Sequence, residues 1–144
     1  MAARHGGIAH GMTVNSFTSL SLDPPLVSVS LEKITRTYQL VEKAKTFSVT
    51  ILSAGQRALS NRFAGRESEH SDRFEGLETF SLESGNPILT QGLAFFDCRV
   101  TASHDAGTHT VFIGEVLVCG QLSENEEPPL VYFNRGYRKL DIAK

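Results

Sequence analysis

The chain of 144 residues carries almost no excess charge, with 14 basic residues against 16 acidic ones and a formal net charge of −2. It has no basic cluster interleaved with aromatic residues, so electrostatic binding to nucleic acid is excluded as an expected function. It also lacks an apolar run near the roughly 18 residues that cross a bilayer, and its N-terminus has no apolar signal-peptide core. The sequence therefore predicts a single-domain cytoplasmic protein.

Cysteine is scarce as well. Cys98 and Cys119 lie in apolar, strand-like segments on either side of a predicted hairpin. If the turn centres on residues 106–107, Cys98 faces a position about four residues from Cys119, which at ~3.3 Å per residue is beyond the reach of a disulfide. We therefore expect two buried free thiols and no redox pair.

Several motifs that would identify an enzyme class are missing from the sequence. It has no Gly-x-Ser-x-Gly elbow, no His-Glu-x-x-His motif and no close pairing of cysteine with histidine. It also has no Gly-x-Gly-x-x-Gly fingerprint, so no Rossmann domain is expected to bind a dinucleotide. His5 and His10 lie in a glycine-rich terminus that we expect to be mobile, and His70 lies among charged residues. No metal site is expected.

What the chain does contain is a series of short strand signals, rich in β-branched residues and bounded by glycine, proline or serine. Strands are predicted over residues 13–17, 26–31, 47–52, 93–102, 110–118 and 130–133. Many strands with few helices predict a mainly β protein, a closed, Greek-key-like β-barrel with a few short helices packed outside it.

Two short helices are expected. One spans residues 35–45 and begins at a threonine suited to an N-cap, and a capping box over residues 53–56 precedes the other, over 57–63. Gly65 would end the second helix. Residues 65–91 are too long for an ordinary connection, so a surface excursion with local structure of its own is expected there.

The first predicted strand carries more hydroxyl and amide side chains than an ordinary core strand. Asn15, Ser16 and Thr18 offer donors and acceptors that could bind the polar atoms of a ligand, while apolar neighbours hold the segment against a core. Read without further information, a hydroxyl-rich strand end at the surface is the simpler alternative. A proline turn at residues 23–25 then leads into the next strand.

The sequence over residues 13–27 resembles the signature of the flavin reductase-like family, whose fold is the FMN-binding split barrel. The resemblance continues, in the family's order, through residues 59–65, 107–116 and 129–138. It implies a homodimeric NAD(P)H:flavin oxidoreductase that reduces FMN or FAD with NADH or NADPH and supplies a partner monooxygenase. The cofactors carry the hydride chemistry in such a protein, and the chain contributes stacking geometry and water exclusion.

Proteins of the resembled family usually carry a helix and a first strand ahead of the segment that begins at His10, whereas only residues 1–9 precede it here. We therefore expect a barrel strand to be missing, either by truncation or because a neighbouring element or subunit closes the gap. An open edge beside the predicted flavin strand would weaken both stability and cofactor affinity.

A phosphate-binding corner is predicted where the second strand ends and the first helix begins. Lys33, Thr35, Arg36 and Thr37 supply two cations and two hydroxyls beside unpaired helix N–H groups, which favour an anion. Plain helix capping with solvated charges is the alternative at these positions.

The remaining candidates come from the resemblance. His109 matches the histidine of the family's Gly-Asp-His motif, which approaches the nicotinamide, although Thr108 stands where aspartate is usual. Residues 61–63 match a second contact on the phosphate side, and residues 137–138 match the nicotinamide side. The complete predicted site comprises Thr13, Asn15, Ser16, Phe17, Thr18, Ser19, Ser30, Lys33, Thr35, Arg36, Thr37, Asn61, Arg62, Phe63, His109, Tyr137 and Arg138.

The segments 93–102 and 110–118 are apolar on both faces. One face is therefore expected to meet a helix or a second subunit, which agrees with a homodimer. Two other functions remain open on the sequence: a split-barrel protein that holds flavin for electron transfer or storage, and a non-enzymatic dimeric β-barrel interaction module. Bound flavin would exclude the module, and oxidation of NADH with added flavin would exclude pure storage.

Overall fold

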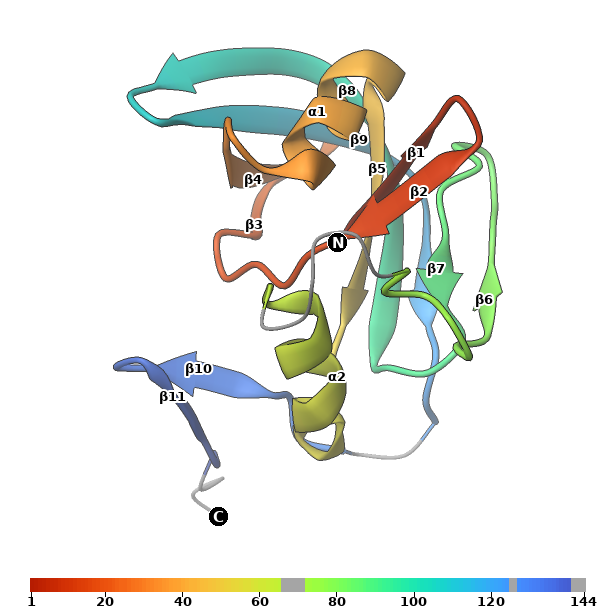
Figure 1. Cartoon of the computed structure of the whole chain (residues 1–144), viewed down its shortest axis with the longest axis vertical. Coiled ribbons are helices and arrows are strands. Elements are labelled where there is room, and N and C mark those ends of the chain that lie inside the picture. The colour runs from red at the N-terminus through yellow and green to blue at the C-terminus, as the bar shows by residue number, and fades with distance from the viewer. Residues whose placement is uncertain (66–71, 125–126, 141–144) are drawn as a thin grey trace.

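The computed structural model describes residues 1–65, 72–124 and 127–140, and its main feature is a strongly curved antiparallel sheet of seven strands (Figure 1). The strand order is β2-β1-β5-β8-β9-β4-β3. The sheet comprises β1 (Ala2–His5), β2 (Ile8–Gly11), β3 (Thr18–Leu22), β4 (Pro25–Glu32), β5 (Thr46–Ile51), β8 (Ala94–Ala106) and β9 (His109–Gln121). The mainly β class is confirmed.

Two small hairpins and two short helices surround this sheet. They are α1 (Arg36–Ala44), the 3-10 turn η1 (Ala54–Gln56), α2 (Arg57–Phe63), β6 (Thr79–Phe80) with β7 (Ile88–Leu89), and β10 (Val131–Phe133) with β11 (Gly136–Arg138). No helix of the described ranges has both the length and the apolar character needed to span a membrane. The position of His70 lies outside the described residues.

The predicted closed barrel is not confirmed. β2 and β3 are the two edges of the sheet, and no pairing joins them within the described part of the chain. The predicted strand over residues 13–17 is also wrong, because residues 12–17 run as an irregular connection from one edge to the other (Figure 1). We call residues 12–17 the crossing segment. Its Thr13 and Ser16 hydroxyls, and not a regular backbone ladder, bond it to α2 and β4.

The expectation of a mobile N-terminus is wrong as well. Gly6 and Gly7, both with positive φ, form the turn of the β1–β2 hairpin, and Ala2 pairs with Ser48 of β5. Ala3 is fully buried and His10 almost so. A two-glycine turn between short strands is a hairpin signal. Sequence analysis considered this segment only for its histidines and overlooked that signal.

The other predicted elements are confirmed, although β8 and β9 each extend to 13 residues. α1 begins as expected, since the Thr35 hydroxyl accepts the Tyr38 N–H at 3.3 Å. Ahead of α2, the Gln56 side chain accepts the Ser53 N–H at 2.9 Å. A side chain therefore satisfies a free N–H group at the start of α1, and the predicted capping box forms at the start of η1, which leads into α2.

The core lies between the sheet and α1. β4 buries Val27, Val29 and Leu31 on one face, in strict alternation, and α1 adds Leu40 and Val41. One position of β9 is also sterically fixed. A Cβ at residue 114 would lie 2.6 Å from the ring of the buried phenylalanine at position 47, so only glycine fits.

The two cysteines differ in burial, which corrects the expectation that both are buried. Cys98 pairs with Val116 across the hairpin, while Cys119 pairs with Phe96, and both thiols are free. Cys119 is exposed. Burial, together with the neighbouring Asp97 carboxylate, raises the pKa of the Cys98 thiol to about 12. Cys98 therefore stays protonated at neutral pH.

Part of the second apolar face of β8 contacts another strand of the chain, and a second subunit on this face stays a prediction. The ring of Phe95 packs edge-on against Phe80 of β6, with ring centroids 5.3 Å apart. The loop between β6 and β7 is fixed by the buried Asp97, which accepts the Ser84 N–H at 2.9 Å and also the Ser84 hydroxyl. Described residues 72–91 thus form the locally structured excursion that the sequence predicts.

Candidate functional site

The crossing segment lies along a cavity of about 480 Å³. Five predicted site residues line it together, and most of the remaining lining is apolar, with residues of β5, α2 and β10 among it. The five are Thr13, Asn15, Phe17, Phe63 and Tyr137. A cavity of this size with a few polar groups at its edge is typical of a small-molecule site.

Hydroxyls of the crossing segment hold its backbone in place. The Thr13 hydroxyl donates to the Ser60 carbonyl at 2.6 Å, and the Thr13 N–H donates to the Phe63 carbonyl at 2.9 Å. The Ser16 hydroxyl donates to the Ser30 carbonyl at 2.9 Å and accepts the Ser30 N–H at 3.1 Å. These side chains, predicted as ligand contacts, therefore tie the segment to α2 on one side and to β4 on the other.

Aromatic rings and one amide complete this part of the cavity. Phe17 packs on Phe96 of β8 with ring centroids 5.2 Å apart, and Phe63 packs on Phe74 at 5.1 Å. Asn15 is exposed at the cavity, where its amide can both donate and accept. The arrangement combines apolar surface with one adaptable polar group.

Tyr137 reaches the cavity from the β10–β11 hairpin. Its hydroxyl lies 2.9 Å from Ser60 Oγ and 3.0 Å from Asn61 Oδ1, and the Arg57 guanidinium lies 5.1 Å from its ring centroid. Tyr137 and Asn61 are therefore brought together, and of the two it is Tyr137 that lines the cavity. The exposed Arg138 instead donates to the Tyr137 carbonyl at 3.0 Å.

Arginines brace the neighbouring turn. Arg62, predicted as a phosphate-side contact, donates to the Glu75 carbonyl at 2.7 Å. Arg73, which sequence analysis did not single out, is buried and donates to the Gly11 carbonyl at 2.9 Å and the Phe63 carbonyl at 3.0 Å. Both arginines thus fix backbone around the cavity. A lone arginine in a polar loop carries no sequence signal of such a role.

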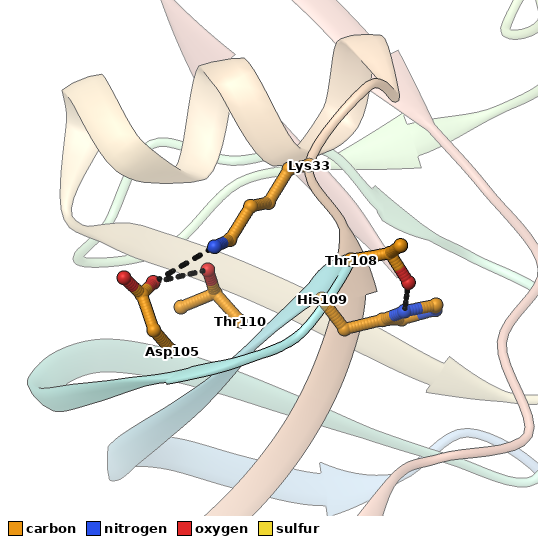
Figure 2. Close-up of polar contacts among 5 residues, drawn as sticks. All are labelled: Lys33, Asp105, Thr108, His109 and Thr110. Atoms are coloured by element: carbon orange, nitrogen blue, oxygen red, sulfur yellow. Dashed lines mark hydrogen bonds and ion pairs between the residues drawn. The ribbon is translucent and has the colours of Figure 1, made fainter.

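A second group of predicted residues gathers where β4 meets α1, against the tip of the β8–β9 hairpin. We call residues 32–36 and 105–109 the junction. Glu32 pairs with His109 in the sheet, and the Lys33 N–H donates to the Thr108 carbonyl at 3.0 Å. Figure 2 shows the Lys33 ammonium turned to Asp105, with Nζ and Oδ1 3.2 Å apart. The predicted phosphate and nicotinamide contacts Lys33 and His109 are therefore neighbours.

Thr108, which stands where the family usually has aspartate, contacts the histidine that follows it. Its hydroxyl lies 2.9 Å from Nδ1 of His109 (Figure 2). A hydroxyl can donate or accept, so it orients the ring in either neutral tautomer without adding a negative charge. The substitution that weakened the sequence argument thus leaves His109 with an orienting partner.

The other members of the predicted phosphate corner point in different directions. Thr35 caps α1, its hydroxyl also donating to the Glu32 carbonyl at 2.8 Å. Thr37 is buried, with its hydroxyl 2.8 Å from Nδ1 of His10. Arg36 borders a separate cavity of about 370 Å³ beside the β1–β2 hairpin.

The predicted site thus falls into two regions. Phe63 and Tyr137 line the cavity, with Asn61 of α2 beside Tyr137, while Lys33 and His109 lie at the junction, where β4 leads into α1. The crossing segment runs between them, and its Ser16 contacts Ser30 on β4. Thr18 and Ser19 are exposed on the edge strand β3. In the described ranges, no three His, Cys, Asp or Glu side chains are grouped to hold a metal.

Known proteins of one family are similar to this chain over nearly its full length. Residues 1–141 match the family model described as flavin reductase like domain. The reductase component of 4-hydroxyphenylacetate 3-monooxygenase from Thermus thermophilus is 40% identical over 140 residues, 97% of this chain and 85% of that protein. NADH-dependent flavin reductase StyB from Pseudomonas fluorescens is 38% identical over 131 residues, 91% of this chain and 74% of that protein.

Solved structures agree with these relatives. NADH:FAD oxidoreductase SgcE6 of Streptomyces globisporus C-1027, in complex with NAD and FAD fragments, is 30% identical, with a TM-score of 0.87. The match covers 97% of this chain and 82% of that one. The mainly β architecture described above is therefore shared with a flavin reductase, and the resemblance seen in the sequence is confirmed.

Proposed function

Because the chain belongs to the flavin reductase-like family, we propose that it reduces FMN or FAD with NADH or NADPH. The observation that carries this proposal is the position of the crossing segment. It holds the sequence signature of the family and lines the cavity of about 480 Å³ with Thr13, Asn15 and Phe17. A storage or interaction role has no such support, since the named relatives are reductases.

The flavin ring fits the cavity in chemical character. Phe17, Phe63 and Tyr137 provide aromatic surface for a flat ring system, and Asn15 provides a donor and an acceptor for its polar atoms. Residues 61–63 lie at this end, next to Tyr137, so we assign them to the ring and not to the phosphate.

The phosphate is assigned to the junction. Lys33 supplies an ammonium there, and α1 begins at Arg36 with free N–H groups that favour an anion. The buried Thr37 hydroxyl contacts His10 in the interior. Thr37 therefore helps to hold the start of α1 in place and does not itself contact the phosphate. The corner proposed from the structure is therefore narrower than the one predicted from sequence.

When both substrates are bound, the nicotinamide supplies a hydride to the flavin, and no side chain has to transfer a proton. The chain's contribution is to hold the ring against the crossing segment and to exclude water from the cavity. His109, oriented by Thr108, is proposed to position the nicotinamide. Its loss would then affect nicotinamide binding more than flavin binding.

A homodimer and a partner monooxygenase belong to the same proposal. β3 is an edge strand of the sheet. On it Leu20 is exposed and Leu22 almost fully so, and Phe133 is exposed on β10. Apolar residues on an open edge favour pairing with a second copy, which would also complete the barrel. The Thermus thermophilus relative is named as a monooxygenase reductase component. The cytoplasmic location stays a prediction.

Two measurements test the proposal. Mixing the purified protein anaerobically with NADH and FMN should bleach the flavin absorbance, with a rate proportional to protein concentration. Binding of flavin without NADH oxidation would contradict the reductase and favour storage, and the absence of both would favour an interaction module. Sedimentation at micromolar concentration should give about twice the mass of one chain, and a fully active monomer would contradict the dimer.

A further inference from the structure

The ammonium assigned to the phosphate already has an anionic partner. Lys33 Nζ lies 3.2 Å from Oδ1 of Asp105, whose side chain is 81% exposed at the tip of the β8–β9 hairpin. The buried Thr110 hydroxyl donates to the same oxygen at 3.4 Å (Figure 2). Asp105 is therefore held toward Lys33 from its own hairpin.

This ion pair is not needed to hold the hairpin in place. The backbone bond from Lys33 to Thr108 and the pairing of β4 with β9 already join the two segments. An exposed pair of this kind also contributes little to folding, because water screens it. The Asp105 carboxylate thus lacks a structural requirement, while it lies beside the cation assigned to the ligand.

We propose that Asp105 competes with the flavin phosphate for Lys33 and so keeps the flavin exchangeable. The inference rests on the proposed function, in which Lys33 binds the phosphate. An incoming phosphate must displace the Asp105 carboxylate from the Lys33 ammonium or share the ammonium with it. When both anions contact the same ammonium, they also repel each other. Both effects weaken binding of the phosphate, and neither acts on the ring.

The test compares FMN with riboflavin, which has the same ring and no phosphate. Asp105→Asn keeps the size of the side chain and an oxygen for Thr110 but removes the charge. The dissociation constant for FMN should fall roughly twofold to fivefold at low salt, and that for riboflavin should stay unchanged. The gain should shrink at roughly 0.5 M salt, since the interaction is then screened.

Two further variants separate the inference from its premise. Lys33→Met should weaken the binding of FMN and leave the binding of riboflavin unchanged. In the Lys33→Met background, Asp105→Asn should lower the FMN dissociation constant by less than it does in the wild-type protein. If Lys33→Met leaves FMN binding unchanged, the phosphate assignment itself fails. If Lys33→Met weakens FMN but Asp105→Asn does not tighten it, the competition is overturned and the phosphate assignment stands.

The chain offers a matched control for general charge effects. Glu42 forms an exposed ion pair with Lys45 at the other end of α1, with Oε2 and Nζ 2.9 Å apart. Glu42→Gln removes one negative charge from a similar pair and should leave the FMN dissociation constant unchanged. An equal tightening by Glu42→Gln would attribute the effect to net charge and would overturn the role of Asp105.

Discussion

The cavity and the junction are built by opposite means. Around the cavity, aromatic rings pack on one another, and buried donors such as Arg73 satisfy backbone carbonyls. At the junction, charged and exposed side chains meet at a hairpin tip, and Ile34 between them is 80% exposed. The first region depends on packing, and the second depends on electrostatics.

The difference matches the two halves of a flavin nucleotide. An aromatic ring gains from apolar, water-free surface, whereas a phosphate dianion needs cations and helix N–H groups that water can also reach. The crossing segment joins the two regions through Thr13 at α2 and Ser16 at β4. Perturbing one region at a time should therefore separate ring binding from phosphate binding, and folding stability from charge.

The largest effect is expected at the cavity. Phe63→Ala removes a buried ring that packs on Phe74, so the free energy of unfolding should fall by about 3–5 kcal/mol. Ile34→Ala at the junction should change it by less than about 0.5 kcal/mol, because that side chain is exposed. Urea unfolding measures both, and similar losses would erase the contrast between the regions.

At the junction, Lys33→Ala should weaken FMN binding while the protein stays folded. A charge-assisted contact contributes about 1.5–3 kcal/mol, which corresponds to roughly a tenfold to hundredfold rise in the dissociation constant. Riboflavin binding should hardly change. Arg138→Ala provides the control, because that exposed arginine bonds only locally to Tyr137 among the contacts described. Unchanged FMN affinity in Lys33→Ala would remove Lys33 from the corner.

A smaller effect is expected from His109→Ala. The nicotinamide KM should rise about threefold to tenfold, or about 0.7–1.4 kcal/mol, with flavin affinity nearly intact. Activity should persist because hydride transfer needs no proton from this ring. Steady-state kinetics and the melting temperature decide the matter: a lowered Tm with unchanged kinetics would make His109 a structural residue of the hairpin.

A similarly small effect is expected from Tyr137→Phe. It removes only the hydroxyl near Ser60 and Asn61, so stability should fall by about 0.5–1.5 kcal/mol. The ring that lines the cavity remains, and flavin affinity should therefore change less than in Phe63→Ala. Thermal unfolding and flavin titration measure the two quantities. A larger loss of nicotinamide affinity here than in His109→Ala would assign the positioning of the nicotinamide to Tyr137 instead of His109.

Local patterns in the sequence were enough for most of the sheet. The alternation of Val27, Val29 and Leu31 predicts β4 directly, and the threonine before α1 predicts its start. The crossing segment was beyond such patterns, because the partner of the Thr13 hydroxyl is a carbonyl 47 residues away. No local rule reports a contact of that range.

Helix geometry explains why the side chains predicted to bind the phosphate do not all point to one place. Consecutive residues of an α-helix point about 100° apart, so neighbours in sequence face different surroundings. Arg36 faces the cavity beside the β1–β2 hairpin, while Thr37 enters the core and meets His10. Grouping these residues by sequence proximity therefore overestimated how many could reach one ligand.

The unequal burial of the two cysteines gives the protein a built-in chemical handle. With the Cys98 thiol buried and protonated, a thiol-reactive dye at neutral pH should attach to Cys119 alone, without mutagenesis. Cys119 is paired across the sheet with Phe96, whose ring packs on Phe17 of the crossing segment. A fluorophore on Cys119 would therefore lie next to a residue that contacts the crossing segment, and a change in its fluorescence would report ligand binding.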